Sequence, residues 1–217
     1  KIRIWRKYKT GMEKVIENAI DKKPDLYLIT GDVSDDLKLL PDTLKLISEL
    51  KTPHGGFVSL GNHEYYRGIT DAIRIFTAGA IPLLVNQGTT LQVGKQNIFI
   101  GGADDPVSLK SNITPFLKRT VEMTMGTAPP DAFRVLMSHR PKTLDAVSDQ
   151  KIDLILSGHT HGGQIGFNGR SLFEGMIDKE PYLWGKYKKG KIHAKDTAQF
   201  CTFSAARLIY RSAVRRF

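Results

Sequence analysis

The sequence predicts an α/β fold built on a mixed β-sheet. Two observations support this prediction: apolar, strand-like runs alternate with helix-like segments, and tight turns separate consecutive strand-like runs near the middle of the chain. Alternating strands and helices are typical of α/β domains, whereas strands joined directly by tight turns are antiparallel. With 217 residues, 41% of them hydrophobic, the chain is long enough to bury a core of its own.

The elements follow from local patterns. Apolar residues recur at helical spacing over 12–22, and the apolar run 25–30 predicts a buried strand. A second helix is expected over 41–50, which Pro41 opens where its missing N–H costs nothing. Further strands are expected at 56–60, 83–85, 89–93, 97–100, 133–137 and 153–156, and further helices at 71–76, 113–125 and 142–148. We expect one domain over residues 1–195, followed by a basic segment, 196–217, whose structure the sequence leaves open.

The formal net charge of +10 is concentrated at the ends of the chain. Residues 1–10 hold five basic residues and no acid, and residues 184–217 hold nine basic residues and one acid. Such ends are attracted to anionic lipid headgroups, but they are equally typical of solvated tails. The lack of an aromatic stacking platform beside them argues against a nucleic-acid partner. No run of about 18 apolar residues is present, and we expect a location in the cytoplasm or peripherally at the cytoplasmic membrane. The oligomeric state is left open.

Polar side chains that can bind metal ions follow four of the predicted strands. In open α/β sheets, ligands bind beyond the carboxyl ends of the strands. Carboxylate, amide and imidazole groups together suit Mn, Fe, Zn and similar divalent ions. The four motifs are Gly31-Asp32-Val33-Ser34-Asp35, Gly61-Asn62-His63-Glu64, His139 and His159-Thr160-His161.

The motif residues suggest distinct chemical tasks. Asp32 has two carboxylate oxygens and can bridge two cations. On an extended loop the rings of His159 and His161 diverge, so they can serve two ions, or one ion and a substrate. Two ions about 3.5–4 Å apart clamp a phosphoryl group and activate a bound water. His63, in a glycine-led loop, is a candidate to protonate a leaving oxygen or to stabilise transition-state charge.

Each motif taken alone also has an ordinary interpretation. A single histidine after a strand is usually a hydrogen-bonded core or surface residue, and Gly-Asp and Gly-Asn are common turns. The joint pattern favours metal binding, because four of the six histidines fall within the motifs. We interpret the other two, His54 and His193, as a loop residue and a tail residue. Asp104-Asp105-Pro106 is expected to be a turn, with a substrate-facing loop as the alternative.

The segments GDVSD, GNHE, SHRP and GHTHGGQI resemble the motifs of the calcineurin-like metallophosphoesterase superfamily over roughly residues 12–170. The longer forms GNHEYY and GHTHGGQI are most similar to its bacterial branch of membrane-associated phosphohydrolases. The resemblance implies two mixed β-sheets flanked by helices and a centre of two divalent ions, with Mn favoured over Fe, Zn or Mg. It implies that His63 is catalytic, that Asp32 bridges the ions, that Asn62, His139 and His159 bind the second ion, that His161 binds the first, and that Asp35 and Glu64 support the site.

The implied activity is metal-dependent hydrolysis of a phosphodiester, pyrophosphate or phosphomonoester. A phosphorylated small molecule or a lipid-linked substrate such as UDP-diacylglucosamine is expected, the latter together with contact to an anionic membrane. Two alternatives stay open. One is a non-catalytic interaction module of the same fold with a half-empty metal site, and the other is a nuclease, which the charge of +10 suggests.

Two features depart from the family pattern. The family's Asp-x-His motif, which supplies two ligands to the first ion, has no counterpart before Asp32. We expect either that this sequence begins just after the motif, or that the motif is lost and the first ion has only Asp32 and His161. Residues 196–217 also do not resemble the closing strands of the family.

Overall fold

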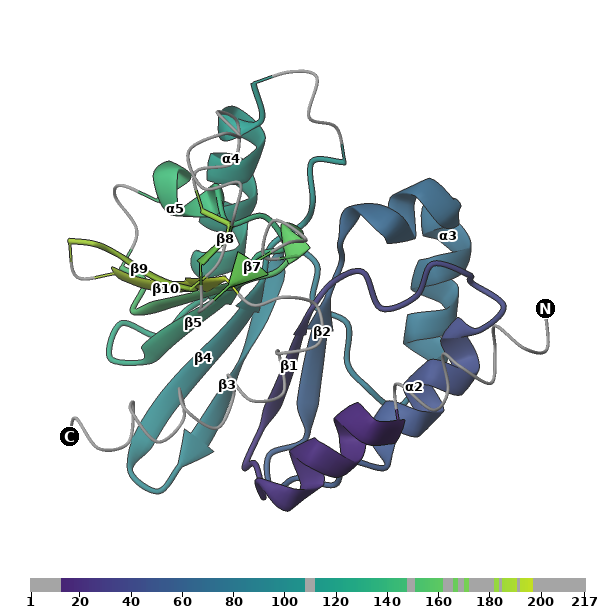
Figure 1. The fold of residues 1–217 in the computed structure, drawn as a ribbon. Helices are drawn as coiled ribbons and strands as arrows, with labels where there is room; N and C mark the ends of the chain where they lie inside the picture. Colours follow the sequence, from purple (N-terminus) through teal and green to yellow (C-terminus); the bar gives the residue numbers. More distant parts are fainter. Residues whose placement is uncertain are drawn as a thin grey trace.

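Two β-sheets pack face to face, and helices cover the outer side of each (Figure 1). This architecture is seen in a computed structural model that describes residues 13–107, 112–147, 151–161, 166–167, 170–171, 182–183, 185–190 and 192–196. Parallel and antiparallel strand pairs occur together in the larger sheet. The predicted α/β sandwich with a mixed sheet is therefore confirmed.

The smaller sheet consists of two parallel strands, β1 (Tyr27–Thr30) and β2 (Gly56–Ser59). All of their residues are buried, which is typical of parallel strands covered on both faces. The outer face is covered by a helix over residues 13–21, by α2 (Leu40–Ser48) and by α3 (Asn62–Ala78).

The larger sheet has six strands in the order β3-β4-β5-β6-β10-β9. The four inner strands run parallel, and the two edge strands are antiparallel to their neighbours. The bounds are β3 Gln87–Val93, β4 Gln96–Gly102, β5 Phe133–Met137, β6 Leu154–Ser157, β9 Gly185–Lys189 and β10 Ile192–Asp196. On its outer face lie α4 (Thr114–Met125) and α5 (Thr143–Ala146), and the short strands β7 (Gly166–Phe167) and β8 (Arg170–Ser171) form a separate hairpin.

Alternation along the strands divides the core into layers. In β1, Leu28 faces the larger sheet, where it packs in one cluster with Ile100 and Met137, whereas Ile29 packs with the helices. In β5 the neighbouring residue Leu136 points to the other side, toward α4 and α5. This two-residue period is the one expected of strands. The inward-facing residues of β1 and β5 pack in one cluster, so the two strands lie against each other.

The structure corrects three predictions of local structure. His193 is not in a tail but lies in β10, where it pairs with Leu154 of β6. Residues 83–85 do not form a strand; Leu83 makes only an isolated bridge to Val58. The segment Asn62-His63-Glu64 is not in a loop but forms the first turn of α3, with Gly61 as its N-cap. The Glu64 carboxylate accepts the Gly61 N–H, which satisfies an N–H that would otherwise lack a partner at the start of the helix.

Several predictions fall partly outside the described residues. These are the start of the first helix at Met12, the end of the predicted helix at Ser148, and the segment 197–217. Within the described part of the chain, none of the helices is both long and apolar enough to cross a membrane.

Candidate metal centre

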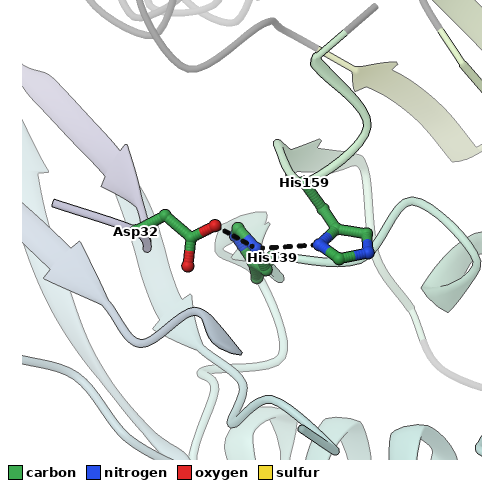
Figure 2. Close-up of side chains that lie close together, drawn as sticks. All are labelled: Asp32, His139 and His159. Atoms are coloured by element: carbon green, nitrogen blue, oxygen red, sulfur yellow. Dashed lines mark hydrogen bonds and ion pairs between the residues drawn. The ribbon is translucent and has the colours of Figure 1, made fainter. Parts of the chain in front are cut away.

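Three side chains converge beyond the carboxyl ends of β1, β5 and β6 (Figure 2). Asp32, His139 and His159 each offer one ligand atom, and these atoms lie within 4.8 Å of one another. Asp32 Oδ2 is 3.0 Å from His139 Nε2, and His159 Nδ1 is 3.2 Å from the same nitrogen. Loops separated by more than a hundred residues in the sequence therefore meet at one point.

His139 is the centre of this cluster and is fully buried. Its Nδ1 lies 2.7 Å from the carbonyl oxygen of Thr30, so Nδ1–H donates to that carbonyl and Nε2 points into the cluster. The amide oxygen of Asn62 also lies 3.1 Å from Nε2. Lone-pair-bearing atoms of Asp32, Asn62 and His159 thus gather around one nitrogen, an arrangement that a shared proton or a cation stabilises. The donor set suits a divalent transition metal.

Burial and charge pairing have opposite effects on the pKa values of Asp32 and His139 in this cluster. Burial alone would raise the pKa of Asp32, but the hydrogen bond and charge of His139, together with His63, lower it to about 2. Burial alone would lower the pKa of His139, and the Asp32 carboxylate outweighs this effect and raises it. Asp32 is therefore a carboxylate at neutral pH, as a metal ligand must be.

The backbone of the loop that carries Asp32 touches the backbone at the start of α3, which carries Asn62. Gly31 has a φ of +86°, and a Cβ at this position would collide with the backbone of Gly61. Asp32 itself has a φ of +53°, a left-handed conformation that is uncommon for a residue other than glycine. Such conformations persist where surrounding contacts enforce them.

Those contacts come from Glu64, which is fully buried. Its carboxylate accepts N–H groups from Asp32 (3.0 Å), Val33 (2.8 Å) and Gly61 (2.8 Å). Burial and the neighbouring charge of Asp32 raise the pKa of Glu64, although the three N–H groups oppose this shift. Glu64 therefore links the loop that carries Asp32 to the start of α3 through backbone N–H groups of both.

His63 lies at the open side of the cluster, with 31% of its side chain exposed. Its backbone N–H donates to Asp32 Oδ1 (2.9 Å), and its Nε2 lies 3.9 Å from Asp32 Oδ2. Its Nδ1 is hydrogen-bonded to Asp35, which also accepts a hydrogen bond from Arg67 (3.4 Å). Asp35 thus orients the ring and leaves Nε2 directed toward the cluster.

His159 has a second set of neighbours that the sequence analysis missed. Its Nε2 lies 2.9 Å from Arg140 Nη1. The buried guanidinium of Arg140 donates through Nε to Asp105 Oδ2 (2.9 Å) and through Nη2 to Asp105 Oδ1 (3.3 Å). Burial, His139 and Arg140 lower the pKa of His159 to about 3, which keeps the ring uncharged at neutral pH. Asp105 lies just beyond the end of β4, as the recognised motifs lie beyond their strands, so the sequence held a signal for it.

His161 does not join the cluster. Its side chain is exposed, and among the described residues the group with mutually close ligand atoms contains Asp32, His139 and His159 but not His161. Both His159 and His161 have positive φ values, +71° and +52°. The segment is therefore not the extended loop that the sequence analysis assumed, and of the two histidines only His159 belongs to the group.

The site and the fold agree with comparisons to known proteins. The family described as calcineurin-like phosphoesterase matches residues 8–163. An uncharacterised metallophosphoesterase of Campylobacter jejuni is 33% identical over 71% of this chain and 40% of its own length. One from Aquifex aeolicus is 30% identical over 76% of this chain and 63% of its own length. The fold and the cluster are those expected of a calcineurin-like phosphoesterase.

The chain belongs to the calcineurin-like phosphoesterase family, and this membership implies divalent metal ions. Solved structures support the fold. The protein TT1561 of Thermus thermophilus matches with a TM-score of 0.59 at 9% identity, over 91% of this chain and 90% of that one. The NAD nucleotidase of Haemophilus influenzae matches with a TM-score of 0.55 at 16% identity, over 86% and 38%. Several of the curated relatives are more than twice as long as the segment of them that this chain matches.

Proposed function

We propose that this chain is a metal-dependent phosphoesterase that hydrolyses a phosphodiester, pyrophosphate or phosphomonoester. The observation that carries the proposal is the convergence of Asp32, His139 and His159 within 4.8 Å beyond the carboxyl ends of three strands. Family membership supports the reaction class. The NAD nucleotidase and the 5'-nucleotidase precursor among the structural neighbours act, by their names, on phosphorylated small molecules, which fits such a substrate.

In this proposal Asp32, Asn62, His139 and His159 hold one of two divalent cations, with Mn favoured over Fe, Zn and Mg. A bound cation of this kind polarises a phosphoryl oxygen and lowers the pKa of its bound water. The chain's own contribution is to fix the donors. The Thr30 carbonyl orients His139, and Glu64 fixes the backbone that carries Asp32.

His63 is proposed as the catalytic group that donates a proton to the leaving oxygen. Its ring is partly exposed, so a substrate can reach it, and its Nε2 is directed toward the cluster. The hydrogen bond to Asp35 holds Nδ1 and steadies this orientation. A positioned acid of this kind contributes roughly 10²–10⁴-fold to a rate.

Hydrolysis of an aryl phosphodiester in the presence of Mn²⁺ tests the proposal. We expect activity from the unchanged chain and a fall of at least about 100-fold in kcat/KM for Asp32→Asn, since even the loss of an outer-shell partner costs 10- to 100-fold. Asp71→Asn, an exposed carboxylate on the surface of α3, is the matched control and should leave kcat/KM unchanged. Equal activity of the Asp32→Asn variant and the unchanged chain would refute the proposal.

A second candidate function is a non-catalytic interaction module with a half-empty metal site. The exposed position of His161 outside the cluster favours it, because among the described residues only one group of mutually close ligand atoms forms. The number of Mn²⁺ ions bound per chain separates the two. Two ions, with Asp32 bridging and His161 on the first ion, support the enzyme, whereas one ion or none supports the module.

A lipid-linked pyrophosphate such as UDP-diacylglucosamine is the finer hypothesis for the substrate, with peripheral contact to an anionic membrane. It is supported by the five basic residues within residues 1–10 and the nine within residues 184–217. Sedimentation with phosphatidylglycerol vesicles at low salt tests the membrane contact. Protein that stays in the supernatant would remove the support for it.

A further inference from the structure

The largest buried charged side chain at the centre, that of Arg140, is not a proposed ligand. Arg140 and Asp105 are each only 1% exposed, and they form a two-pronged ion pair. Oδ1 of Asp105 also accepts the N–H of Val107 (2.6 Å), and Nη2 of Arg140 donates to the Val107 carbonyl (3.4 Å). Three of these contacts hold the guanidinium in place, and its remaining nitrogen, Nη1, is directed at His159.

The two ring nitrogens of His159 face opposite neighbours. Nδ1 lies 3.2 Å from His139 Nε2 and belongs to the cluster, whereas Nε2 lies 2.9 Å from Arg140 Nη1. A guanidinium has only donors, so the ring must accept at Nε2 to make this hydrogen bond. A histidine that binds a cation through one nitrogen keeps an N–H on the other and donates it to an acceptor such as a carboxylate or carbonyl.

The same imidazole cannot satisfy both partners. If Nδ1 binds a cation, the N–H at Nε2 faces the N–H of Arg140, and two positive charges lie on either side of one ring. We propose that Arg140 and the divalent cation compete for the imidazole of His159, and that Asp105 limits this competition by fixing and neutralising the guanidinium. The inference rests on the proposed function, because it assumes that the cluster binds a cation.

The proposal predicts effects of opposite sign for the two members of one ion pair. Arg140→Gln removes the competing donor and leaves the buried Asp105 carboxylate without its positive partner, so we expect the Kd for Mn²⁺ to fall by about tenfold. Asp105→Asn leaves the guanidinium without its countercharge, so we expect the Kd to rise by about tenfold. Outer-shell substitutions at metal sites change affinity by about this much. Arg140→Lys keeps a positive, donor-only group and should stay within about threefold of the unchanged chain.

The measurement is Mn²⁺ titration of the full chain, followed by electron paramagnetic resonance, with folding checked by circular dichroism. Arg74→Gln, which breaks an exposed ion pair with Asp71, is the matched control and should leave the Kd unchanged. Weaker Mn²⁺ binding by Arg140→Gln would overturn the proposal, because the pair would then only hold the site together. If Arg140→Gln does not fold, the double variant Arg140→Met with Asp105→Asn removes both charges. Tighter binding by it supports the proposal, and weaker binding overturns it.

A His159→Gln background tests whether the effect passes through the ring. There, Arg140→Gln should change the Kd by less than about twofold, since the group for which the two cations compete is gone. If Arg140→Gln still changes the Kd by tenfold in this background, the competition for the ring is refuted, and the effect comes from the charge of Arg140 in general. If the unchanged chain binds no Mn²⁺ at all, the proposed function fails. If it binds Mn²⁺ and the signs are wrong, only this inference fails.

Discussion

The two sides of the metal centre are held by different means. On the side of Asp32, one fully buried carboxylate, Glu64, accepts three backbone N–H groups and so fixes the loop of Asp32 against the start of α3. On the side of His159, a side chain, Arg140, contacts the ring itself, and the ring is only partly buried. Backbone contacts fix where a ligand sits, whereas a contact to the ring also decides what else the ligand can bind. The first side is therefore preorganised, and the second can be adjusted by changing one residue.

The largest expected effect on stability comes from the preorganised side. Glu64→Gln leaves one oxygen where two accepted three N–H groups, so at least one buried N–H loses its partner. We expect the free energy of unfolding to fall by about 2–4 kcal/mol. Urea unfolding of the chain without added metal measures it. Glu49→Gln, at an exposed helix C-cap, is the control and should cost less than about 0.5 kcal/mol. If both substitutions lower the free energy of unfolding by a similar small amount, Glu64 does not hold the loop of Asp32 against the start of α3.

The side of His159 should make the stability of the protein depend on pH. The pKa of His159 is about 3 in the folded chain, against a reference value of 6.5, so the unfolded chain binds more protons at His159 between these values. Its contribution to stability is therefore complete above pH 6.5 and is lost as the pH falls toward 3. His159→Gln lacks this titration. Relative to that variant, the unchanged chain should lose stability on going from pH 7 to pH 5, by at most about 1.4 kcal/mol per pH unit.

Urea unfolding at pH 7, 6 and 5 in the presence of a chelator measures this difference, because no cation then holds the ring. His139 works in the opposite direction, since its pKa is raised and its contribution is lost as the pH rises. It is present in both proteins and therefore contributes to the pH dependence of both. Parallel pH dependence of the two proteins would show that the ring of His159 is not shielded as the structure implies.

Features of these two sides can be predicted from the sequence where they depend on local patterns, but not where they depend on contacts between residues far apart in the chain. The positions of Asp32, Asn62, His139 and His159 follow from local apolar runs, because each run sets where a strand ends and its motif begins. The helical start at Asn62 also had a local signal, Glu64 three residues after Gly61, which the expectation of a loop overlooked. The pair of Arg140 and Asp105 joins residues 35 apart through a tertiary contact. No spacing rule predicts such a pair, and Asp104-Asp105-Pro106 looked like an ordinary turn.

His161 is expected to show the smallest effect on stability and on the affinity of the cluster. Its side chain is exposed and lies outside the group formed by Asp32, His139 and His159. His161→Gln should therefore change the free energy of unfolding by less than about 0.5 kcal/mol and leave the affinity for the more tightly bound Mn²⁺ within about twofold. If His161 binds the first ion of a two-ion centre, the same variant should bind one Mn²⁺ where the unchanged chain binds two, and hydrolysis should fall. If His161→Gln instead loses the more tightly bound ion, His161 belongs to the cluster. The comparison between the side of Asp32 and the side of His159 would then have to count His161 among the ligands.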